Sequence, residues 1–555
     1  MKEYTFDLLK KACENEECQA FLQMVKKEYE QSFEGKPIVR PSYLKYKRIE
    51  IDGNRKEYET EYFSLRIRLA CLEVLVLTDD KYLDDFEETL SAICDSFTWV
   101  LPAHAYLGKG EYDYERVDLF SAETAFYLAE AAVVFKDKIT PDLYKRIYTS
   151  VEQKAIAFIG GKGNWWKECG NNWASVCAGS LGCAYLYLFP ERYQEVATLV
   201  DGCMERFLGG FDDDGVCLEG ISYWQYGFFF FALFYDVYQK RTGIRAEILD
   251  LPKVKKILKY AVNARLAGDI YLPFADGGTS SFVPRAEVIY TVKNLFGADM
   301  PIPQMSFKVT GTALLFRVLE GISEYGTKED TVALEEFVYY PKCEVYIRRK
   351  GEFIFTAKGG HNNEFHNHND VGAFELLYKG KRVITDIGSG EYTWEYFNAR
   401  GENGRYGKKI FVCSSLSHSV PLVDGQEQVE GNAFKGEVLV ANEEEFALDI
   451  ARAYQNPVDK LEVSYKLKES GLRVAYKTAG VKEKIAFCFV YENEPTIKDG
   501  VVEINGVKLT ASKNLPVGVC AWTYSTHAAE ENTAYVVEFT ATADEAREVE
   551  FFFKA

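Results

Sequence analysis

The chain has 555 residues, of which 47% are hydrophobic and 27% are charged, and its formal net charge is −19. This length predicts two or more domains, and the acidic charge argues against nucleic acid or an anionic membrane as a partner. The sequence contains no run of about 18 apolar residues, so it predicts no membrane span. The first residues contain no secretory segment and the 13 cysteines form no CxxC pair, so we expect a cytoplasmic protein with reduced thiols.

Residues 1 to about 325 have the pattern of successive helices. Between Glu195 and Gly209, apolar residues recur at helical spacing and form one stripe, and Gly209 and Gly210 supply a stop signal. Successive helices with short connections become antiparallel neighbours, which predicts a helical bundle or a toroid. Further amphipathic runs occur at 63–77, 85–100, 119–136, 142–158, 172–188, 226–240, 253–266 and 284–295.

The pattern changes near residue 335, where strand-like alternation begins. The run CEVYIRRKGEFIFTAKGG alternates around a KGE turn and predicts a hairpin. Asn505 and Gly506 lie between two alternating runs, which is the strongest short-range hairpin signal. Short strands with turns every 8–12 residues or so indicate an antiparallel sandwich. We therefore predict a helical domain over residues 1–325 and a β-sandwich over residues 335–555.

Two stretches of the helical half differ from ordinary helix. In NWWKECGNNW, Asn171 and Asn172 lie at a loop-to-helix junction beside Trp173. An asparagine there either caps the helix or points into a cleft where aromatic rings stack on sugars. In EGISYWQYG, Tyr223 and Tyr226 are spaced i, i+3 and share a helix face. They are either aromatic residues at a domain boundary or, with a lowered pKa, proton shuttles.

Histidines concentrate in the strand-rich half. Of the six in the chain, His361, His366 and His368 lie within eight residues, and His418 follows in another polar stretch. If His366 and His368 lie in a strand, they and Asp370 face one side of it. Two imidazoles and a carboxylate, with one position open, are a familiar Zn²⁺ ligand set. A polar loop with hydrogen-bonded histidines is the alternative.

A basic cluster follows this stretch. Arg400, Arg405, Lys408 and Lys409 lie close together in an otherwise acidic chain. Guanidinium groups bind carboxylate or sulfate well, so the cluster suits an acidic substrate. A solvated loop is the alternative interpretation.

The run HNHNDVGAFELLYKGKRVITDIGSGEYT resembles the signature of the heparinase II/III family of polysaccharide lyases, a His-x-His-x-Asp-x-Gly-x-Phe run before a strand that ends in Asp-x-Gly. HSVPLVDGQEQ resembles the segment that follows it in that family. In the helical half, NNWASVCAG and EGISYWQYG resemble the catalytic Asn/His and Tyr segments. The resemblance implies an N-terminal incomplete (α/α) toroid followed by a C-terminal antiparallel β-sandwich.

The resemblance also implies a reaction. These enzymes cleave uronic-acid-containing chains by β-elimination and leave 4,5-unsaturated products. Asn172, with Asn171 as the alternative, would be the amide that neutralises the uronate carboxylate. His366 would neutralise that carboxylate or act as the base. Tyr223, with Tyr226 as the alternative, would act as base, as acid towards the leaving oxygen, or as both.

The remaining site residues come from the same resemblance. His368, Asp386 and His418 match the zinc positions of some members, where the metal is mainly structural. Where many members have an Arg-Ser-x-x-His-Asn run, this chain has CSSLSHSV, which leaves the details of substrate anchoring open. His104 lies where some members carry a cleft residue, although a capping or core histidine fits as well. The residues expected to bind substrate are His104, Trp173, Glu219, Arg400 and Arg405.

We expect the substrate to be an acidic oligosaccharide. Fragments of a glycosaminoglycan such as heparan sulfate, chondroitin or hyaluronan are the first choice, and alginate-like uronates the second. A toroid glycoside hydrolase acting on unsaturated uronides is an alternative, and it needs two carboxylates, for which Glu168, Glu219 and Asp212–Asp214 are available. A non-catalytic carbohydrate-binding protein is a third interpretation. The sequence is compatible with a homo-oligomer.

Overall fold

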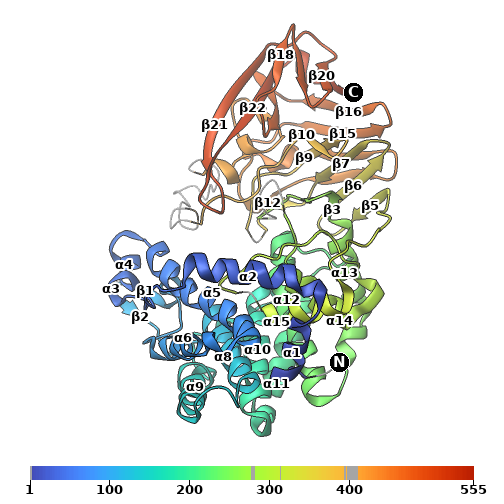
Figure 1. Ribbon diagram of the computed structural model, residues 1–555. Helices are drawn as coiled ribbons and strands as arrows, with labels where there is room; N and C mark the ends of the chain where they lie inside the picture. Colours follow the sequence, from blue (N-terminus) through green and yellow to red (C-terminus); the bar gives the residue numbers. More distant parts are fainter. Residues whose placement is uncertain (1–2, 277–281, 313, 365, 393–395, 397–409) are drawn as a thin grey trace. The chain divides into compact units, whose positions relative to one another are not determined.

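The computed structural model of this chain describes residues 3–276, 282–312, 314–364, 366–392, 396 and 410–555. Helices predominate up to α15, which ends at Tyr325, and strands predominate from β5, which begins at Phe337 (Figure 1). The predicted order, a helical half followed by a sheet-rich region, is confirmed. None of the helices in the described part of the chain combines the length and the apolar character that a membrane span requires.

The chain divides into two compact units that alternate along the sequence. The helical unit comprises Met1–Phe211, Gln225–Lys255 and Val283–Val332. The sheet unit comprises Asp212–Trp224, Lys256–Phe282 and Ala333–Ala555, so it also takes in two segments from the helical half of the sequence. The predicted domains, 1–325 and 335–555, stay a prediction.

Nearly every residue of α8 and of α10 is buried, and the two helices pack against each other in the helical unit. These two helices are buried on nearly all sides, whereas α6 and α9 each bury one stripe of side chains along the helix. The predicted amphipathic runs all fall on helices, but the α-helices in the runs 85–100, 142–158 and 253–266 end early, at Asp95, Lys154 and Asn263. The helices are α1 (Phe6–Cys13), α2 (Gln19–Ser32), α3 (Tyr43–Tyr46), α4 (Arg48–Asp52), α5 (Lys56–Thr78), α6 (Leu83–Asp95), α7 (Pro102–Ala105), α8 (Leu119–Val134), α9 (Pro141–Lys154), α10 (Asn172–Leu188), α11 (Ala197–Gly209), α12 (Ile221–Thr242), α13 (Pro252–Asn263), α14 (Ala286–Phe296) and α15 (Leu315–Tyr325).

A buried ion pair joins two helices of the helical unit. The Arg317 guanidinium on α15 donates to Glu130 on α8, and the two residues are 0% and 2% exposed. The hydroxyl of Tyr187 donates a 2.8 Å hydrogen bond to the other Glu130 oxygen.

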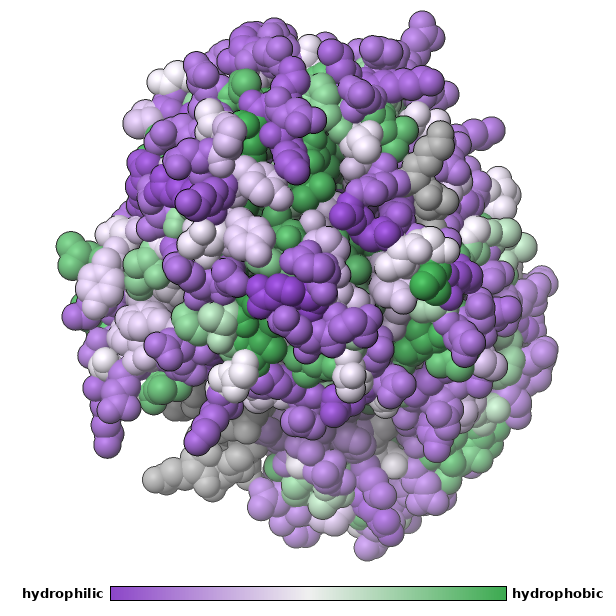
Figure 2. Space-filling view, turned by 90° about the horizontal axis from the view of Figure 1, so that it is seen from below, coloured by the Kyte–Doolittle hydropathy of each residue, from purple (hydrophilic) through white to green (hydrophobic). Residues whose placement is uncertain are grey.

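The surface differs from this interior, because the face in Figure 2 is mostly hydrophilic, with hydrophobic side chains only in small groups.

The described part of the sheet unit contains two two-stranded sheets, β12-β8 and β3-β4, and three larger antiparallel sheets, with the strand orders β10-β9-β7-β6-β5, β11-β17-β22-β21 and β13-β14-β15-β16-β23-β20-β19-β18. Their buried faces share an aromatic core that includes Phe374, Tyr465 and Phe489. The strands are β1 (Tyr106–Gly108), β2 (Glu111–Tyr112), β3 (Arg265–Ala267), β4 (Ile270–Tyr271), β5 (Phe337–Tyr340), β6 (Val345–Lys350), β7 (Phe353–Lys358), β8 (His361–Asn362), β9 (Phe374–Tyr378), β10 (Lys381–Ile384), β11 (Leu422–Val423), β12 (Gly431–Lys435), β13 (Glu437–Ala441), β14 (Phe446–Asp449), β15 (Lys460–Lys468), β16 (Gly471–Ala479), β17 (Lys484–Tyr491), β18 (Thr496–Lys498), β19 (Val501–Ile504), β20 (Val507–Ala511), β21 (Val517–Ser525), β22 (Glu531–Thr542) and β23 (Glu548–Lys554).

Both predicted hairpins are present. β6 and β7 pair around Gly351, and β19 and β20 pair around Asn505 and Gly506. Asn505 and Gly506 have φ angles of +51° and +81°, as a type I′ turn requires of its two central residues.

We predict that Arg317→Met destabilises the helical unit. The substitution keeps most of the side-chain volume but leaves the Glu130 carboxylate buried without its cation, which costs about 3–5 kcal/mol. Urea unfolding followed by circular dichroism measures the loss. Arg547→Met is the control, because Arg547 and its partner Asp544 have side chains that are 77% and 88% exposed. The control should change the free energy of unfolding by less than about 1 kcal/mol, and equal effects of the two variants would contradict the prediction.

Candidate active site

The buried carboxylate of Asp276 lies at the centre of a polar cluster in the sheet unit. Asp276 is 3% exposed. Its Oδ2 lies 2.6 Å from His366 Nδ1, and its Oδ1 lies 3.2 Å from His368 Nε2. The hydroxyls of Tyr392 and Tyr396 donate to Oδ2 and Oδ1, respectively. Burial alone would raise the pKa of Asp276, but the hydrogen bonds from both histidines outweigh it and hold the pKa well below its usual range.

The backbone at His366 has a left-handed conformation. Its φ is +54°, which is uncommon for a residue other than glycine. Residues 366–370 do not form a strand, so the expectation that His366, His368 and Asp370 share one strand face is wrong. Because of the left-handed turn, strand alternation does not hold here, and Asp370 instead pairs with Lys358 Nζ at 2.9 Å.

Tyr223 lies at the start of α12, in the part of this helix that belongs to the sheet unit. Its ring stacks on the His366 imidazole, with ring centroids 4.5 Å apart. Its hydroxyl lies 2.8 Å from the hydroxyl of Tyr392, which in turn donates to Asp276. Burial raises the pKa of Tyr223 well above its ordinary value. A proton shuttle with a lowered pKa was one of two interpretations of this residue, and burial acts against that lowering because it disfavours the charged phenolate.

Tyr226 follows three residues later on α12, in the helical unit, and has different partners. Its hydroxyl donates a 2.6 Å hydrogen bond to Glu123 Oε1, and the hydroxyl of Tyr127 donates a 2.6 Å hydrogen bond to Oε2. Glu123 is 1% exposed, and burial raises its pKa to about 7. Burial also raises the pKa of Tyr226, so it disfavours the phenolate of this tyrosine too.

The structure brings together the three predicted metal ligands. His368, Asp386 and His418 are buried, and one potential ligand atom of each lies within 4.8 Å of the others. His368 Nδ1 lies 3.2 Å from His418 Nε2, and His418 Nδ1 lies 3.0 Å from Asp386 Oδ2. Asp276 contacts His368 at Nε2, so Nδ1 is the ring nitrogen that could bind a metal. A carboxylate commonly holds the other ring nitrogen of a metal-binding histidine in this way. Two imidazoles and a carboxylate fit Zn²⁺ with one open position.

In the helical unit, the two candidate asparagines begin α10. Asn171 is the N-cap, because its side-chain oxygen accepts a 3.1 Å hydrogen bond from the Trp173 amide and contacts the Cys169 thiol at 3.0 Å. Asn172 is 8% exposed, and we find no hydrogen bond of its side-chain amide within the described part of the chain. A Cβ at Gly227 would lie 3.1 Å from the Asn172 Cβ, so glycine there permits close packing of α12 on α10. Of the two asparagines, Asn172 therefore has the side-chain amide with fewer hydrogen bonds to the described residues.

His104 and Trp173 lie next to each other near this helix end. Their ring centroids are 4.9 Å apart, and Trp173 lies 4.7 Å from the ring of Trp165, which is 45% exposed. His104 Nδ1 lies 2.7 Å from the carboxylate of Asp118, the N-cap of α8. His104 is thus anchored by a capping residue, and the exposed aromatic ring of the group belongs to Trp165, which the sequence interpretation did not single out.

The remaining residues predicted from the sequence are Glu219, Arg400 and Arg405, together with Glu168 of the hydrolase alternative. Glu219 is 8% exposed in the sheet unit; burial raises its pKa, and the charge of His366 is the main opposing influence. Arg400 and Arg405 lie outside the described residues. Glu168, available to the hydrolase alternative, has a side chain that is 79% exposed and lies 3.5 Å from Arg206.

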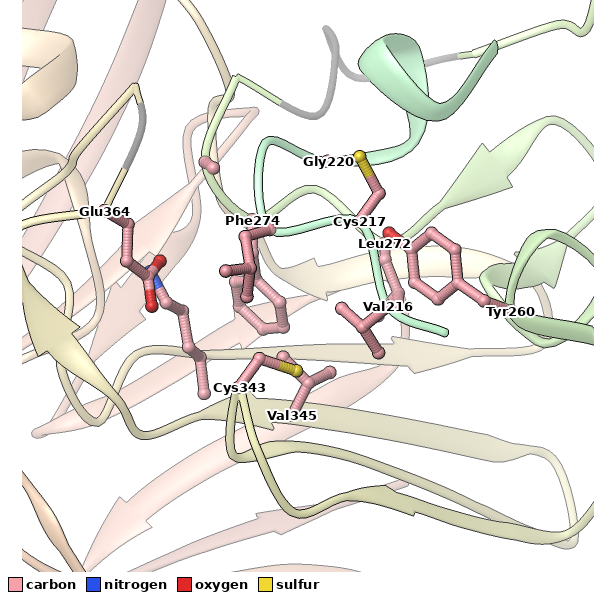
Figure 3. A pocket seen from close by; sticks show the side chains of 12 residues that line it. Val216, Cys217, Gly220, Tyr260, Leu272, Phe274, Cys343, Val345 and Glu364 are labelled. Atoms are coloured by element: carbon pink, nitrogen blue, oxygen red, sulfur yellow. The ribbon is translucent and has the colours of Figure 1, made fainter. Parts of the chain in front are cut away.

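A small cavity in the sheet unit is lined by Cys217, Tyr260, Cys343 and Glu364, among others (Figure 3). Its volume of about 20 Å³ is room for about one water molecule. Glu364 is held by a 2.9 Å ion pair with the buried Lys358. The cavity is therefore too small to hold a sugar.

Three residues that contact the candidate site residues were not found from the sequence. Asp276 and Tyr392 contact His366, and Glu123 accepts a hydrogen bond from Tyr226. Asp276 lies in the run PFADGG, where an Asp before two glycines indicates only a turn. Tyr392 lies at the end of the run HNHNDVGAFELLYKGKRVITDIGSGEYT, but it is not one of the residues that define the pattern. Glu123 is one of two buried carboxylates in α8, the other being Glu130, and a carboxylate in a helix rich in apolar residues is a signal that could have been used.

Residues 333–475 match the family model described as "Heparinase II/III-like, C-terminal". Among solved structures, the chain is similar to a heparinase III, with a TM-score of 0.64 at 12% identity over 97% of this chain and 92% of that chain. It is also similar to a heparan sulfate lyase from Pedobacter heparinus, with a TM-score of 0.56 at 12% identity over 96% and 87% of the two chains. A chondroitin AC lyase from Streptomyces coelicolor A3, in complex with chondroitin sulphate, gives 0.55 at 9% identity over 99% and 82%. No curated protein sequence matches the chain.

Identities this low establish the fold and not the substrate. The predicted architecture, an incomplete (α/α) toroid followed by an antiparallel β-sandwich, is confirmed by these likenesses. The predicted resemblance is confirmed as well, since the matched region contains His366, His368, Asp386 and His418. Residues 333–475 are therefore similar to the heparinase II/III-like C-terminal domain, in a chain with the fold of heparinase III and chondroitin AC lyase.

Proposed function

We propose that this protein is a polysaccharide lyase that cleaves uronic-acid-containing oligosaccharides by β-elimination and leaves 4,5-unsaturated products. The observation that carries the proposal is the arrangement of Tyr223 and His366, stacked at 4.5 Å, with His366 Nδ1 held 2.6 Å from the buried Asp276. The heparinase II/III-like match over residues 333–475 supports it.

Elimination requires a base for the proton on C5 and an acid for the leaving oxygen on C4. If Asp276 accepts the proton of His366 Nδ1, His366 Nε2 carries a lone pair and is suited to act as the base or to bind the uronate. The tautomer follows from this hydrogen bond. Since burial raises the pKa of Tyr223, its hydroxyl stays protonated near neutral pH and is suited to protonate the leaving oxygen.

The substrate carboxylate must be neutralised before the C5 proton becomes acidic. We assign Asn172 to this task, in line with the family resemblance, because its amide is less committed than that of Asn171. We propose a glycosaminoglycan fragment as the substrate and an alginate-type uronate as the second choice. The names of the similar structures, a heparan sulfate lyase and a chondroitin AC lyase, support the first choice.

We also propose that His368, Asp386 and His418 hold Zn²⁺. Bound there, the metal would act as a structural clamp on the loops that carry these residues. Asp276 would then have two tasks, because it contacts His368 with one oxygen and His366 with the other. The position of His366 would thus depend on the same carboxylate that orients a metal ligand.

We expect the wild-type protein to produce ultraviolet absorbance of 4,5-unsaturated uronides from at least one of heparan sulfate, chondroitin, hyaluronan or alginate oligosaccharides. Tyr223→Phe should abolish this absorbance while oligosaccharide still binds, because the variant lacks only the acidic hydroxyl. Tyr226→Phe is the matched control, three residues away on the same helix. New reducing ends without absorbance would indicate a hydrolase, and full activity of Tyr223→Phe with loss in Tyr226→Phe would move the role to Tyr226.

Asp276→Asn should lower kcat by about 10²–10⁴-fold, because an amide no longer fixes the proton on His366 Nδ1. Tyr396→Phe is the control, since it removes a 2.7 Å hydrogen bond from the same carboxylate without touching His366. Steady-state kinetics of both variants separate kcat from KM. An equal loss in the two variants would mean that Asp276 acts only through the stability of the cluster.

His368→Ala should lower the metal content and the melting temperature together, as measured by elemental analysis and calorimetry. His361→Ala is the control, because His361 belongs to the same run but makes only a 3.2 Å contact with the Asn363 amide. A chelator should lower the melting temperature of the wild type and of the control, and leave that of His368→Ala unchanged. A native protein without bound metal would exclude the zinc assignment.

A further inference from the structure

The strand β21 forms one edge of the sheet β11-β17-β22-β21. Residues 518–523 of this strand are all exposed, including the large side chains of Val519 and Trp522, which are 44% and 38% exposed. β21 pairs with β22 in unbroken register from Val517 to Ser525. It is therefore a long edge strand without a bulge, a kind of strand that readily pairs with another chain.

The strand also lacks the charges that usually protect such an edge. From Asn514 to Ala529 the sequence contains no Asp, Glu, Lys or Arg, although 27% of the chain is charged. Edge strands commonly carry lysines or inward-pointing charges that prevent pairing. In a chain with a net charge of −19, a neutral strand is a place where two copies can approach without direct charge repulsion.

The hydrogen bonds at the two ends of β21 show which backbone groups point outward. Pro516 O accepts from Thr540 N and Thr526 N donates to Glu530 O, so even-numbered residues point towards β22. Ser525 O accepts from Glu391 N at 3.1 Å, so odd-numbered residues point the other way. Hence the N–H and C=O groups of residues 517, 519, 521 and 523 line the outer edge, and none of the described residues pairs with them.

We propose that β21 pairs antiparallel with β21 of a second copy of this chain about a two-fold axis. Self-pairing must match outward residues with outward residues, and Ser525 is already bonded to Glu391. The register that uses all of the open positions pairs residue 517 with 523 and residue 519 with 521 of the other copy. Its two-fold axis passes at Cys520, so Cys520 faces its own equivalent in a non-hydrogen-bonded pair.

The side chains are complementary in this register. The Trp522 ring stacks on Phe411 of its own chain, with ring centroids 5.1 Å apart, and it faces Gly518 of the second copy, which adds no side chain that could clash with the indole. On the other face, Val519 faces Ala521 of the second copy. The pairing joins two four-stranded sheets into one continuous sheet and satisfies the open backbone groups of both edges.

Introducing a charge at Cys520 tests the proposal. Wild-type protein should sediment as a dimer in analytical ultracentrifugation. Cys520→Glu and Cys520→Lys should each be monomeric, because like charges would face each other about 4.5 Å apart between Cα atoms. An equimolar mixture of the two variants should restore a dimer containing one copy of each. A monomeric wild type, or variants that both stay dimeric alone, would overturn the proposal.

Oxidative cross-linking tests the register. Of the 13 cysteines, all within described residues, Cys520 is the exposed one. The proposed Cα separation of about 4.5 Å lies within the range of a disulfide. A mild oxidant should therefore give a covalent dimer from the wild type, whereas Cys520→Ser should stay a non-covalent dimer. A dimer that is not cross-linked through Cys520 would overturn this register.

Discussion

The Asp276 carboxylate is the constraint on which the rest of the polar cluster depends. A buried charge is tolerated only where donors compensate for the lost hydration. Here His366, His368, Tyr392 and Tyr396 supply those donors from separate loops of the sheet unit. One group therefore fixes the orientation of both histidines, so the imidazole assigned to the substrate and the imidazole assigned to the metal are not independent.

The two tyrosines on α12 illustrate how position decides chemistry. Tyr223 lies on an imidazole and is linked to a carboxylate through Tyr392, whereas Tyr226 donates directly to the buried Glu123. Burial raises the pKa of both, so neither hydroxyl is prepared to act as a phenolate base in the free protein. The division of roles that we propose, with imidazole as base and phenol as acid, would then be a consequence of desolvation rather than of residue type.

Local sequence patterns predicted those features of the structure that depend only on residues near one another in the sequence. The helices, the turn at Asn505 and Gly506, and the change from helix to strand follow from spacing that one segment contains. The cluster of His368, Asp386 and His418 was predicted from the family resemblance, and the structure brings the three side chains together. Asp276 could not be found this way, because its partners lie far away in sequence. The strand expected at His366 was wrong because its left-handed backbone depends on tertiary contacts that no local pattern records.

The positive φ of His366 has an evolutionary consequence. Glycine and asparagine adopt this conformation at less cost than other residues, whereas β-branched residues resist it. A single change to glycine or asparagine would relieve backbone strain, but it would also take the imidazole away from the buried Asp276 carboxylate. The position is therefore held at histidine by the carboxylate that the imidazole compensates, against the preference of its own backbone conformation.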